Sequence, residues 1–212
     1  MHAGKNTRMR QAGLRAAYAM TCSLLAACGT AVPATHHYRV VVEAATQLAP
    51  EDGPRLVLED FETDPAYEDE RMVYRESAFR LDYDAYNRWD VAPRLLVTTF
   101  LRNAYVTQGS FSWVGDYSPA GALPVLSGRV IALEEVALSK SKSVAHLELA
   151  LWLRSADGHR TLWSERFQHD EPMRERGPDA LAEAMSHALN LVAQKTGPAL
   201  ASIVKAETED GR

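Results

Sequence analysis

The sequence predicts an α+β fold, a mainly antiparallel β-sheet with one or two long helices packed on one face. The clearest observation is a strict alternation in which every second residue of 147–153 is leucine, the period of a half-buried strand. The dipeptide Asp157-Gly158 follows and favours a tight hairpin. Apolar residues then recur at helical spacing in 92–105 and again after residue 177. Strand runs with separate helices are typical of α+β domains.

The first half of the domain is expected to form short strands and then a helix. Strands are predicted over four β-branched or alternating segments, 38–44, 55–61, 71–75 and 78–83. The last two form a hairpin, because Phe79, Leu81 and Tyr83 share one face of the second segment. The helix is predicted over 92–105, with Pro93 in its first turn.

The second half is expected to be mostly strands, closed by a helix. Strands are predicted over 110–114, 123–138, 146–154 and 161–167, with Gly128 at a bulge or bend. The last helix begins at Gly177-Pro178-Asp179. Gly197-Pro198 is expected to break or kink it, with a final turn over 199–204.

Residues 1–27 have the pattern of a bacterial lipoprotein signal peptide. Four basic residues and no acidic one accompany a short apolar run that ends in Leu25-Ala26-Ala27-Cys28. A branched residue and two small residues before a cysteine form a lipobox, whose thiolate receives diacylglycerol. We therefore predict cleavage before Cys28, which then carries diacylglycerol and an N-acyl chain such as palmitate.

Two alternatives remain open for this leader. The segment also fits an ordinary signal peptide cleaved at an Ala-x-Ala-like site. Cys22 lies inside the apolar run after a poorer box and is interpreted as a residue removed with the leader. Translation is compatible with a start at Met1 or at Met9, which would leave a 19-residue signal from Met9 to Ala27.

The rest of the chain is divided into a short tether at 28–36, a folded domain at 37–205 and a flexible, charged tail at 206–212. Removal of residues 1–27 takes away four basic residues and leaves a net charge of about −9. Such a surface is not attracted to anionic membranes, so the lipid must supply the attachment. Gly29, not Asp, follows Cys28, which in Gram-negative sorting implies release to the periplasmic face of the outer membrane.

Composition excludes several classes of protein. With 46% hydrophobic and 24% charged residues in 212, the chain is globular rather than disordered or fibrous. A net charge of −5 argues against a nucleic-acid partner, which selects basic surfaces. No apolar run is long enough to predict a membrane-spanning helix. Both cysteines lie in the first 28 residues, so the folded region holds neither a disulfide framework nor a cysteine metal site.

The sequence carries few groups that suggest reaction chemistry. It has no Gly-x-Ser-x-Gly elbow, no phosphate-binding Gly-Lys-Ser/Thr loop and no His-Glu-x-x-His motif. Seven acidic residues lie in the segment from Glu59 to Glu70. We interpret the segment as a solvated loop between two strands, and the alternative is a divalent-cation site. His36-His37 are interpreted as the polar end of the tether. We therefore expect no catalytic residues, no metal and no cofactor besides the lipid on Cys28.

The order of several short motifs resembles one known family, the ABC-type transport auxiliary lipoproteins. The lipobox comes first. The strand motif Val73-Tyr74-Arg75 is followed by Arg88-Trp89 just before a helix. A strand hairpin over 147–167 and an alanine-rich last helix complete the pattern. The resemblance covers roughly residues 38–195, and in the acidic loop the sequence departs from the family pattern.

This resemblance implies a function in lipid transport. Family members work with MCE-domain (mammalian cell entry) proteins and an ABC transporter to move lipids between membranes, and some form ring-like homo-oligomers. The expected function is that of a non-enzymatic accessory lipoprotein at the outer membrane, with an MCE-domain protein as partner. Val73, Tyr74, Arg75, Arg88 and Trp89 are then structural or partner-contact residues. The alternative is a structural envelope-assembly lipoprotein for lipopolysaccharide or outer-membrane proteins.

Overall fold

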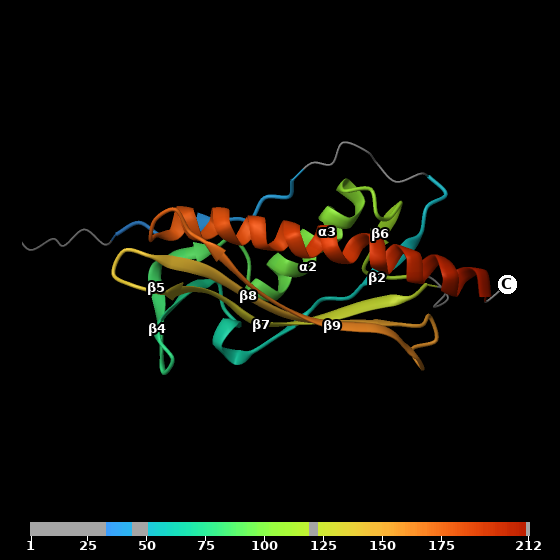
Figure 1. The fold of residues 1–212 in the computed structure, drawn as a ribbon, viewed down its shortest axis with the longest axis horizontal. Coiled ribbons are helices and arrows are strands. Elements are labelled where there is room, and N and C mark those ends of the chain that lie inside the picture. The colour runs from blue at the N-terminus through green and yellow to red at the C-terminus, as the bar shows by residue number, and fades with distance from the viewer. Residues whose placement is uncertain (1–32, 44–50, 119–122, 211–212) are drawn as a thin grey trace, which may run out of the picture. The chain divides into compact units, whose positions relative to one another are not determined.

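A computed structural model describes residues 33–43, 51–118 and 123–210. Residues 35–212 form one compact unit. The described residues form nine strands, one short 3₁₀ helix and two α-helices (Figure 1). In chain order these are β1 (His36–Tyr38), β2 (Arg55–Leu58), β3 (Glu62–Thr63), η1 (Pro65–Tyr67), β4 (Arg71–Ser77), β5 (Arg80–Trp89), α2 (Pro93–Thr107), β6 (Trp113–Gly115), β7 (Val125–Ala137), β8 (Ser143–Arg154), β9 (Thr161–Pro172) and α3 (Pro178–Asp210).

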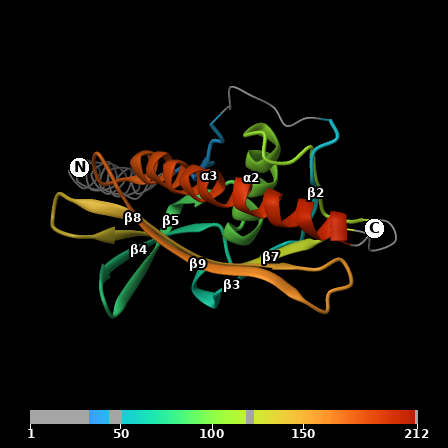
Figure 2. The ribbon, with the colours of Figure 1, turned by 45° about the vertical axis from the view of Figure 1, so that its right-hand side comes forward.

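The α+β prediction is confirmed, and the long strands β7, β8 and β9 form the antiparallel meander that the alternation predicts. Alternate leucines of β8 are buried, and Leu149 pairs with Val130 of β7 and Phe167 of β9. The turn between β8 and β9 places Gly158 at a φ of 75°, which explains the Asp-Gly sequence. Both helices pack on the same face of this sheet (Figure 2).

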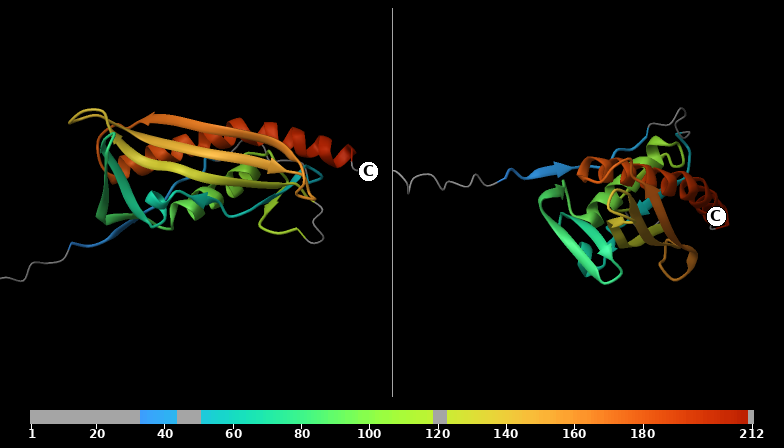
Figure 3. Two further views of the ribbon diagram at one scale, coloured as in Figure 1. Left: turned by 90° about the horizontal axis from the view of Figure 1, so that it is seen from below. Right: turned by 60° about the vertical axis from the view of Figure 1, so that its left-hand side comes forward.

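The sheet is also partly parallel, which the sequence did not indicate. Strand β7 has parallel neighbours in β2, β3 and β4, and short parallel pairs also join β1 to β5 and β2 to β6. Parallel partners are joined by long connections, so no local turn signal marks them. Figure 3, which views the domain from below, shows the long strands crossing in front of the helices.

Helix α2 begins and ends near its predicted bounds. Pro93 occupies its first turn, where the missing N–H costs nothing. Its apolar stripe is buried in the main core, and the residues of that stripe are Leu96, Val97, Phe100, Leu101, Ala104 and Tyr105. Gly109, two residues beyond the helix, has a φ of 76° and turns the chain toward β6.

Helix α3 is longer than predicted, because it continues through Pro198 to Asp210. Of the predicted break or kink at Gly197-Pro198, the break is wrong, and residues 206–210 of the predicted flexible tail are helical. Gly197 serves close packing, since a Cβ there would lie 2.4 Å from the Ser110 hydroxyl. Beyond the proline, Leu200 and Val204 are fully buried. Burial contributes about 1.5–3 kcal/mol each and offsets the cost of an internal proline, about 3 kcal/mol.

The first strand is shorter than predicted and begins earlier. β1 covers His36–Tyr38, so His36 belongs to the sheet and not to the predicted 28–36 tether. The backbone from residue 39 to 43 has no strand neighbour and bonds to side chains of α3 instead. The N–H of Val41 donates to Ser186 Oγ, and the N–H of Glu43 donates to Asn190 Oδ1, both at 3.0 Å. Asn190 Nδ2 returns a bond to the Val41 carbonyl at 3.0 Å.

No helix within the described ranges combines the length and apolar character that a membrane crossing requires. Residues 1–32, including Cys22 and Cys28, lie outside the described residues. The signal peptide, the lipid site and most of the tether therefore stay predictions.

The fold makes Trp89 a stability determinant. Its side chain is fully buried in the main core, and truncation of such a residue leaves a cavity. We expect Trp89→Ala to lower the free energy of unfolding by about 3–5 kcal/mol in urea titrations followed by circular dichroism. Trp152→Ala, at a half-buried position on β8, is the matched control and should cost less. A Trp89 variant that melts within a degree or two of wild type would contradict this packing role.

Candidate functional site

The residues singled out from the sequence come together on one structural element, the β4–β5 hairpin. Val73, Tyr74 and Arg75 lie on β4, and Arg88 and Trp89 lie at the end of β5. Strand β4 pairs with β7 over only two positions, Tyr74 with Glu135 and Arg75 with Val136. The hairpin is therefore joined to the main sheet by a short ladder near its middle, and its tip projects beyond the sheet (Figure 1).

One face of the hairpin is fixed by a buried carboxylate. Glu134 of β7 is 1% exposed, and Arg75 Nε donates to its Oε1 at 2.6 Å. The Tyr67 hydroxyl donates to Glu134 Oε2 at 2.9 Å. The hydrogen bond to Glu134 raises the pKa of Arg75, and burial followed by the Glu134 charge raises the pKa of Tyr67. Both partners therefore keep the protons that the carboxylate needs at neutral pH.

Apolar packing surrounds this ion pair. Tyr67, Val73 and Ala132 form a small buried cluster that is separate from the main core. Ala132 and Leu133 are consecutive in β7 and belong to different clusters, so the small cluster lies on the sheet face away from α3. Low local dielectric strengthens the hydrogen bonds of Glu134 and also makes the loss of either partner costly.

The other face is fixed by a second buried carboxylate, Glu135. This residue is 2% exposed, and Arg176 Nε donates to its Oε1 at 3.0 Å. Arg176 also donates to Glu76 Oε1 of β4 at 2.6 Å. Arg176 lies just before the first residue of α3. Its two ion pairs therefore connect the start of this helix to Glu135 of β7 and to Glu76 of the hairpin.

Tyr74 holds the two strands of the hairpin together. Its hydroxyl donates to Asp84 Oδ2 of β5 at 3.1 Å, and burial, followed by the Asp84 charge, raises the pKa of Tyr74. Burial acts to raise the pKa of Asp84, but hydrogen bonds outweigh it and lower that pKa overall. These bonds come from the Asn87 side chain and from the backbone N–H groups of Tyr86 and Asn87.

Trp89 and Arg88 lie at the base of the hairpin. The Trp89 backbone N–H donates to the Glu70 carbonyl at 2.7 Å, and its ring fills the core just before α2. The indole Nε1 is buried without a hydrogen-bond partner among the described residues. Arg88 lies 3.9 Å from a carboxylate oxygen of Glu70 and is partly exposed. Trp89 is therefore a packing residue, and Arg88 is a surface residue.

The acidic segment from Glu59 to Glu70 is more ordered than the predicted loop, because it contains β3 and η1. Six of its seven carboxylates lie within 4.0 Å of an arginine. The pairs are Glu59–Arg154, Asp60–Arg94, Glu62–Arg129, Asp64–Arg129, Asp69–Arg71 and Glu70–Arg88. The described residues hold no group of three or more metal-ligating side chains. Five arginines face these seven carboxylates, because Arg129 lies near both Glu62 and Asp64, so much of the negative charge of the segment is compensated within the domain.

Sequence reasoning missed Glu134, Glu135, Tyr67 and Arg176. A signal was present, because two consecutive glutamates interrupt the apolar strand Val130–Ala137. Buried carboxylates of this kind require cationic partners. The partners are distant in sequence, since Arg75 is 59 residues from Glu134 and Arg176 is 41 residues from Glu135. Local sequence patterns therefore could not identify which arginines pair with these glutamates.

The chain is similar to one known protein family and to several solved structures. A family model described as ABC-type transport auxiliary lipoprotein component matches residues 36–196. No curated protein matches the sequence. A crystal structure of a Xanthomonas campestris protein, XCC0632 of the DUF330 family, has a TM-score of 0.69 at 16% identity, over 82% of this chain and 99% of that one. A second, of a protein described as uncharacterised, has a TM-score of 0.63 at 9% identity, over 79% and 99%. These two structures share the fold.

The ion pair between Arg75 and Glu134 yields a stability prediction. Arg75→Ala leaves a buried carboxylate without its cation, and we expect a loss of about 2–4 kcal/mol in the free energy of unfolding. Arg174→Ala is the matched control, because Arg174 pairs with two exposed carboxylates. That substitution should cost at most about 1 kcal/mol. Equal losses for the two variants in urea titrations would show that the buried pair does not hold the hairpin.

Proposed function

Because this chain belongs to the family of ABC-type transport auxiliary lipoproteins, we propose that it is the outer-membrane accessory of a transporter that moves lipids between membranes. The observation that carries the proposal is the family match, which spans residues 36–196 and so includes the sheet, the hairpin and most of α3. In this function an MCE-domain protein is the direct partner. A ring-like homo-oligomer would supply a collar on which that partner docks.

We propose further that the protein acts by docking, without a reaction or a cofactor of its own. Two carboxylates at the hairpin support this, Glu134 of β7 and Asp84 of β5, because each is committed to structural bonds. Glu134 binds Arg75 and Tyr67, and Asp84 binds Tyr74 and Asn87. Groups engaged in this way stiffen the element and are not available for proton transfer to a substrate.

The membrane attachment proposed for the chain rests on Cys28. The lipobox Leu25-Ala26-Ala27-Cys28 and the following Gly29 support a diacylglycerol and N-acyl anchor at the periplasmic face of the outer membrane. Several acyl chains on one residue give stable attachment, at about 0.8 kcal/mol for each buried CH₂ group.

The anchor is tested by Cys28→Ala in cells fed labelled palmitate. We expect the variant to accumulate as unprocessed precursor, to carry no label and to leave the outer-membrane fraction. Cys22→Ala is the matched control and should be processed and labelled like wild type. Normal processing and labelling of Cys28→Ala would contradict the lipid site and favour the ordinary signal peptide.

The transport function is tested by capture of the partner. The full-length tagged lipoprotein should be cross-linked in its own cells and purified in detergent. We expect it to retain the MCE-domain protein of its transporter, and we expect deletion of its gene to alter the lipid composition of the outer membrane. Absence of the MCE-domain protein together with an unchanged envelope would contradict the proposal and favour the envelope-assembly alternative.

A further inference from the structure

The turn between β7 and β8, residues 138–142, combines one exposed apolar side chain with two unpaired cations. Leu138 is 64% exposed, and Lys140 and Lys142 are exposed beside it. Across the ranges that the structure describes, no carboxylate lies within 4.0 Å of either ammonium group. The other two residues of the turn are serines, so the turn contains no acidic side chain. Apolar side chains flanked by free lysines are typical of surfaces that meet a lipid headgroup layer.

Hydrogen bonds hold this turn in one shape. The backbone N–H groups of Leu138 and Ser139 both donate to the Lys142 carbonyl, at 2.9 and 3.0 Å. Ser139 Oγ accepts bonds from the backbone N–H groups of Ser141 and Lys142, at 3.4 and 3.1 Å. The exposed side chains are therefore presented on an ordered backbone, which loses little conformational entropy when the turn binds a partner.

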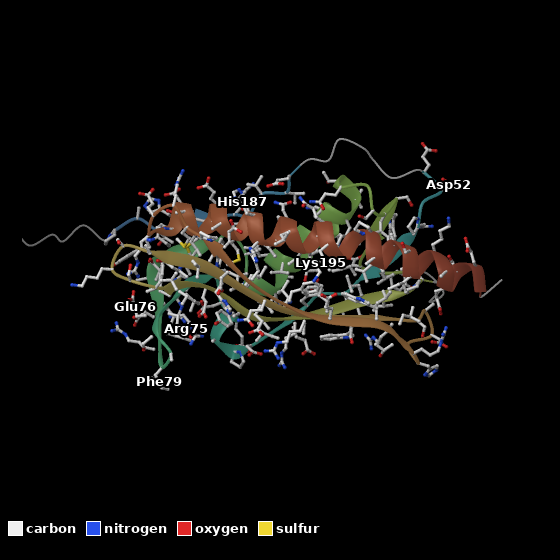
Figure 4. The ribbon with its side chains drawn as sticks, viewed as in Figure 1. Asp52, Arg75, Glu76, Phe79, His187 and Lys195 are labelled. Carbon is white, nitrogen blue, oxygen red and sulfur yellow. The ribbon has the colours of Figure 1, made fainter. Side chains whose placement is uncertain are left out.

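A second exposed apolar side chain lies at the same end of the domain. Phe79, at the tip of the β4–β5 hairpin, is 100% exposed, and Figure 4 shows it pointing away from the sheet. Strands β4 and β7 are parallel, with Arg75 opposite Val136, so both run toward this end. The turn and the hairpin tip both lie on the left in Figure 1. Two apolar side chains on neighbouring projections suit one extended apolar partner.

The chain enters the folded domain at this end as well. His36 of β1 pairs with Asn87 of β5 in the hairpin. Residues 41–43 then bond first to Ser186 and next to Asn190 of α3, so the chain runs along this helix away from its start. His36 therefore lies toward the start of α3, on the side of the domain that carries the hairpin and the turn (Figure 1).

Two lengths limit which surface can face the membrane. The proposed anchor at Cys28 lies eight residue-to-residue steps before His36, which span at most about 28 Å. Eight steps of hairpin, at most about 26 Å, separate Asn87 from Phe79. Helix α3 has 33 residues and a length of about 50 Å. The domain can therefore rest on the hairpin tip, but the tether is too short for it to stand on the far end of α3.

The charge of the turn is opposite to that of the whole domain. Without residues 1–27 the chain carries about −9, whereas the turn carries two lysines and no acidic residue. Charges separated by more than about 10 Å are largely screened at 0.1 M salt, so a lipid phosphate at the turn responds to the local charge. At the hairpin tip, Arg80 is paired with Asp82 and adds no net charge. An anionic surface repels the acidic remainder, which favours an orientation with the turn toward the lipid.

We propose that this end of the domain rests on the membrane that holds the anchor. Leu138 and Phe79 enter the headgroup layer, and Lys140 and Lys142 bind the phosphates of anionic phospholipids. The lipid on Cys28 supplies the attachment, and these contacts set the orientation of the domain. The proposal rests on the anchor proposed above and assigns the protein surface that faces the lipid.

Fluorescent labels on introduced cysteines test this contact in the full-length lipoprotein. Cys28 carries lipid in the mature protein, so Leu138→Cys or Phe79→Cys supplies a single free thiol for a polarity-sensitive dye. Each protein is reconstituted into vesicles of phosphatidylethanolamine and phosphatidylglycerol that contain nitroxide-labelled lipid. We expect both labels to shift to shorter emission wavelengths and to be quenched by the nitroxide. Leu191→Cys, at an exposed leucine of α3, is the matched control and should show neither effect.

Flotation of the same vesicles separates this proposal from the anchor. Protein that floats while the label at position 138 or 79 stays in water would overturn the proposal and leave the anchor in place. Protein that does not float would contradict the anchor and overturn the proposal with it. Burial against a second protein cannot imitate the expected result, because quenching by the nitroxide requires proximity to lipid.

The two lysines are tested by variants of matched charge in the labelled Leu138→Cys protein. Each lysine near an anionic surface contributes about a factor of five, so Lys140→Gln with Lys142→Gln should weaken the contact about twenty- to thirtyfold. The measurement is the ratio of quenched to unquenched label. Lys195→Gln with Lys205→Gln removes the same charge from α3 and should leave this ratio unchanged. Equal ratios for the two pairs of substitutions would overturn the proposal.

Discussion

Two neighbouring glutamates in the middle of β7 impose the constraint on which the arrangement of the domain depends. Because consecutive residues of a strand point to opposite faces, Glu134 and Glu135 each need a cation from a different side of the sheet. Arg75 arrives from the hairpin and Arg176 from the segment before α3. A buried carboxylate without such a partner costs several kcal/mol, so both segments must return to the same stretch of β7.

This constraint explains how a weakly paired hairpin becomes a rigid arm. The β4–β7 ladder has two register pairs, which would allow a hairpin to pivot or to slip. The ion pairs flank that ladder, and Arg176 bridges Glu135 to Glu76 on the hairpin itself. The polar bonds therefore fix orientation, while the small cluster around Val73 supplies apolar burial. A stiff arm suits a protein whose proposed function is to dock on other molecules.

The sequence predicted those features that depend on local patterns. The leucine alternation, the Asp157-Gly158 turn and the start of α2 at Pro93 follow from strand period, turn chemistry and the missing proline N–H. The sequence did not predict features that join segments distant along the chain. The parallel neighbours of β7 and the binding of residues 39–43 to Ser186 and Asn190 join distant segments. The prediction of a helix break at Pro198 failed for a different reason, since burial of Leu200 outweighs the local helix-breaking effect of the proline.

Trp89 connects the N-terminal segment to this arm. Tyr38 of β1 pairs with Trp89, and its carbonyl accepts a hydrogen bond from the Asp90 N–H at 2.7 Å. The chain from the predicted lipid site thus enters the fold at the base of the hairpin and not at the long meander. The eight residue-to-residue steps from Cys28 to His36 span at most about 28 Å. An anchor at Cys28 would therefore keep the hairpin base close to the membrane. Confinement of this kind would raise the effective concentration of the hairpin for any partner held at the same membrane, so a contact that is weak in solution could form there.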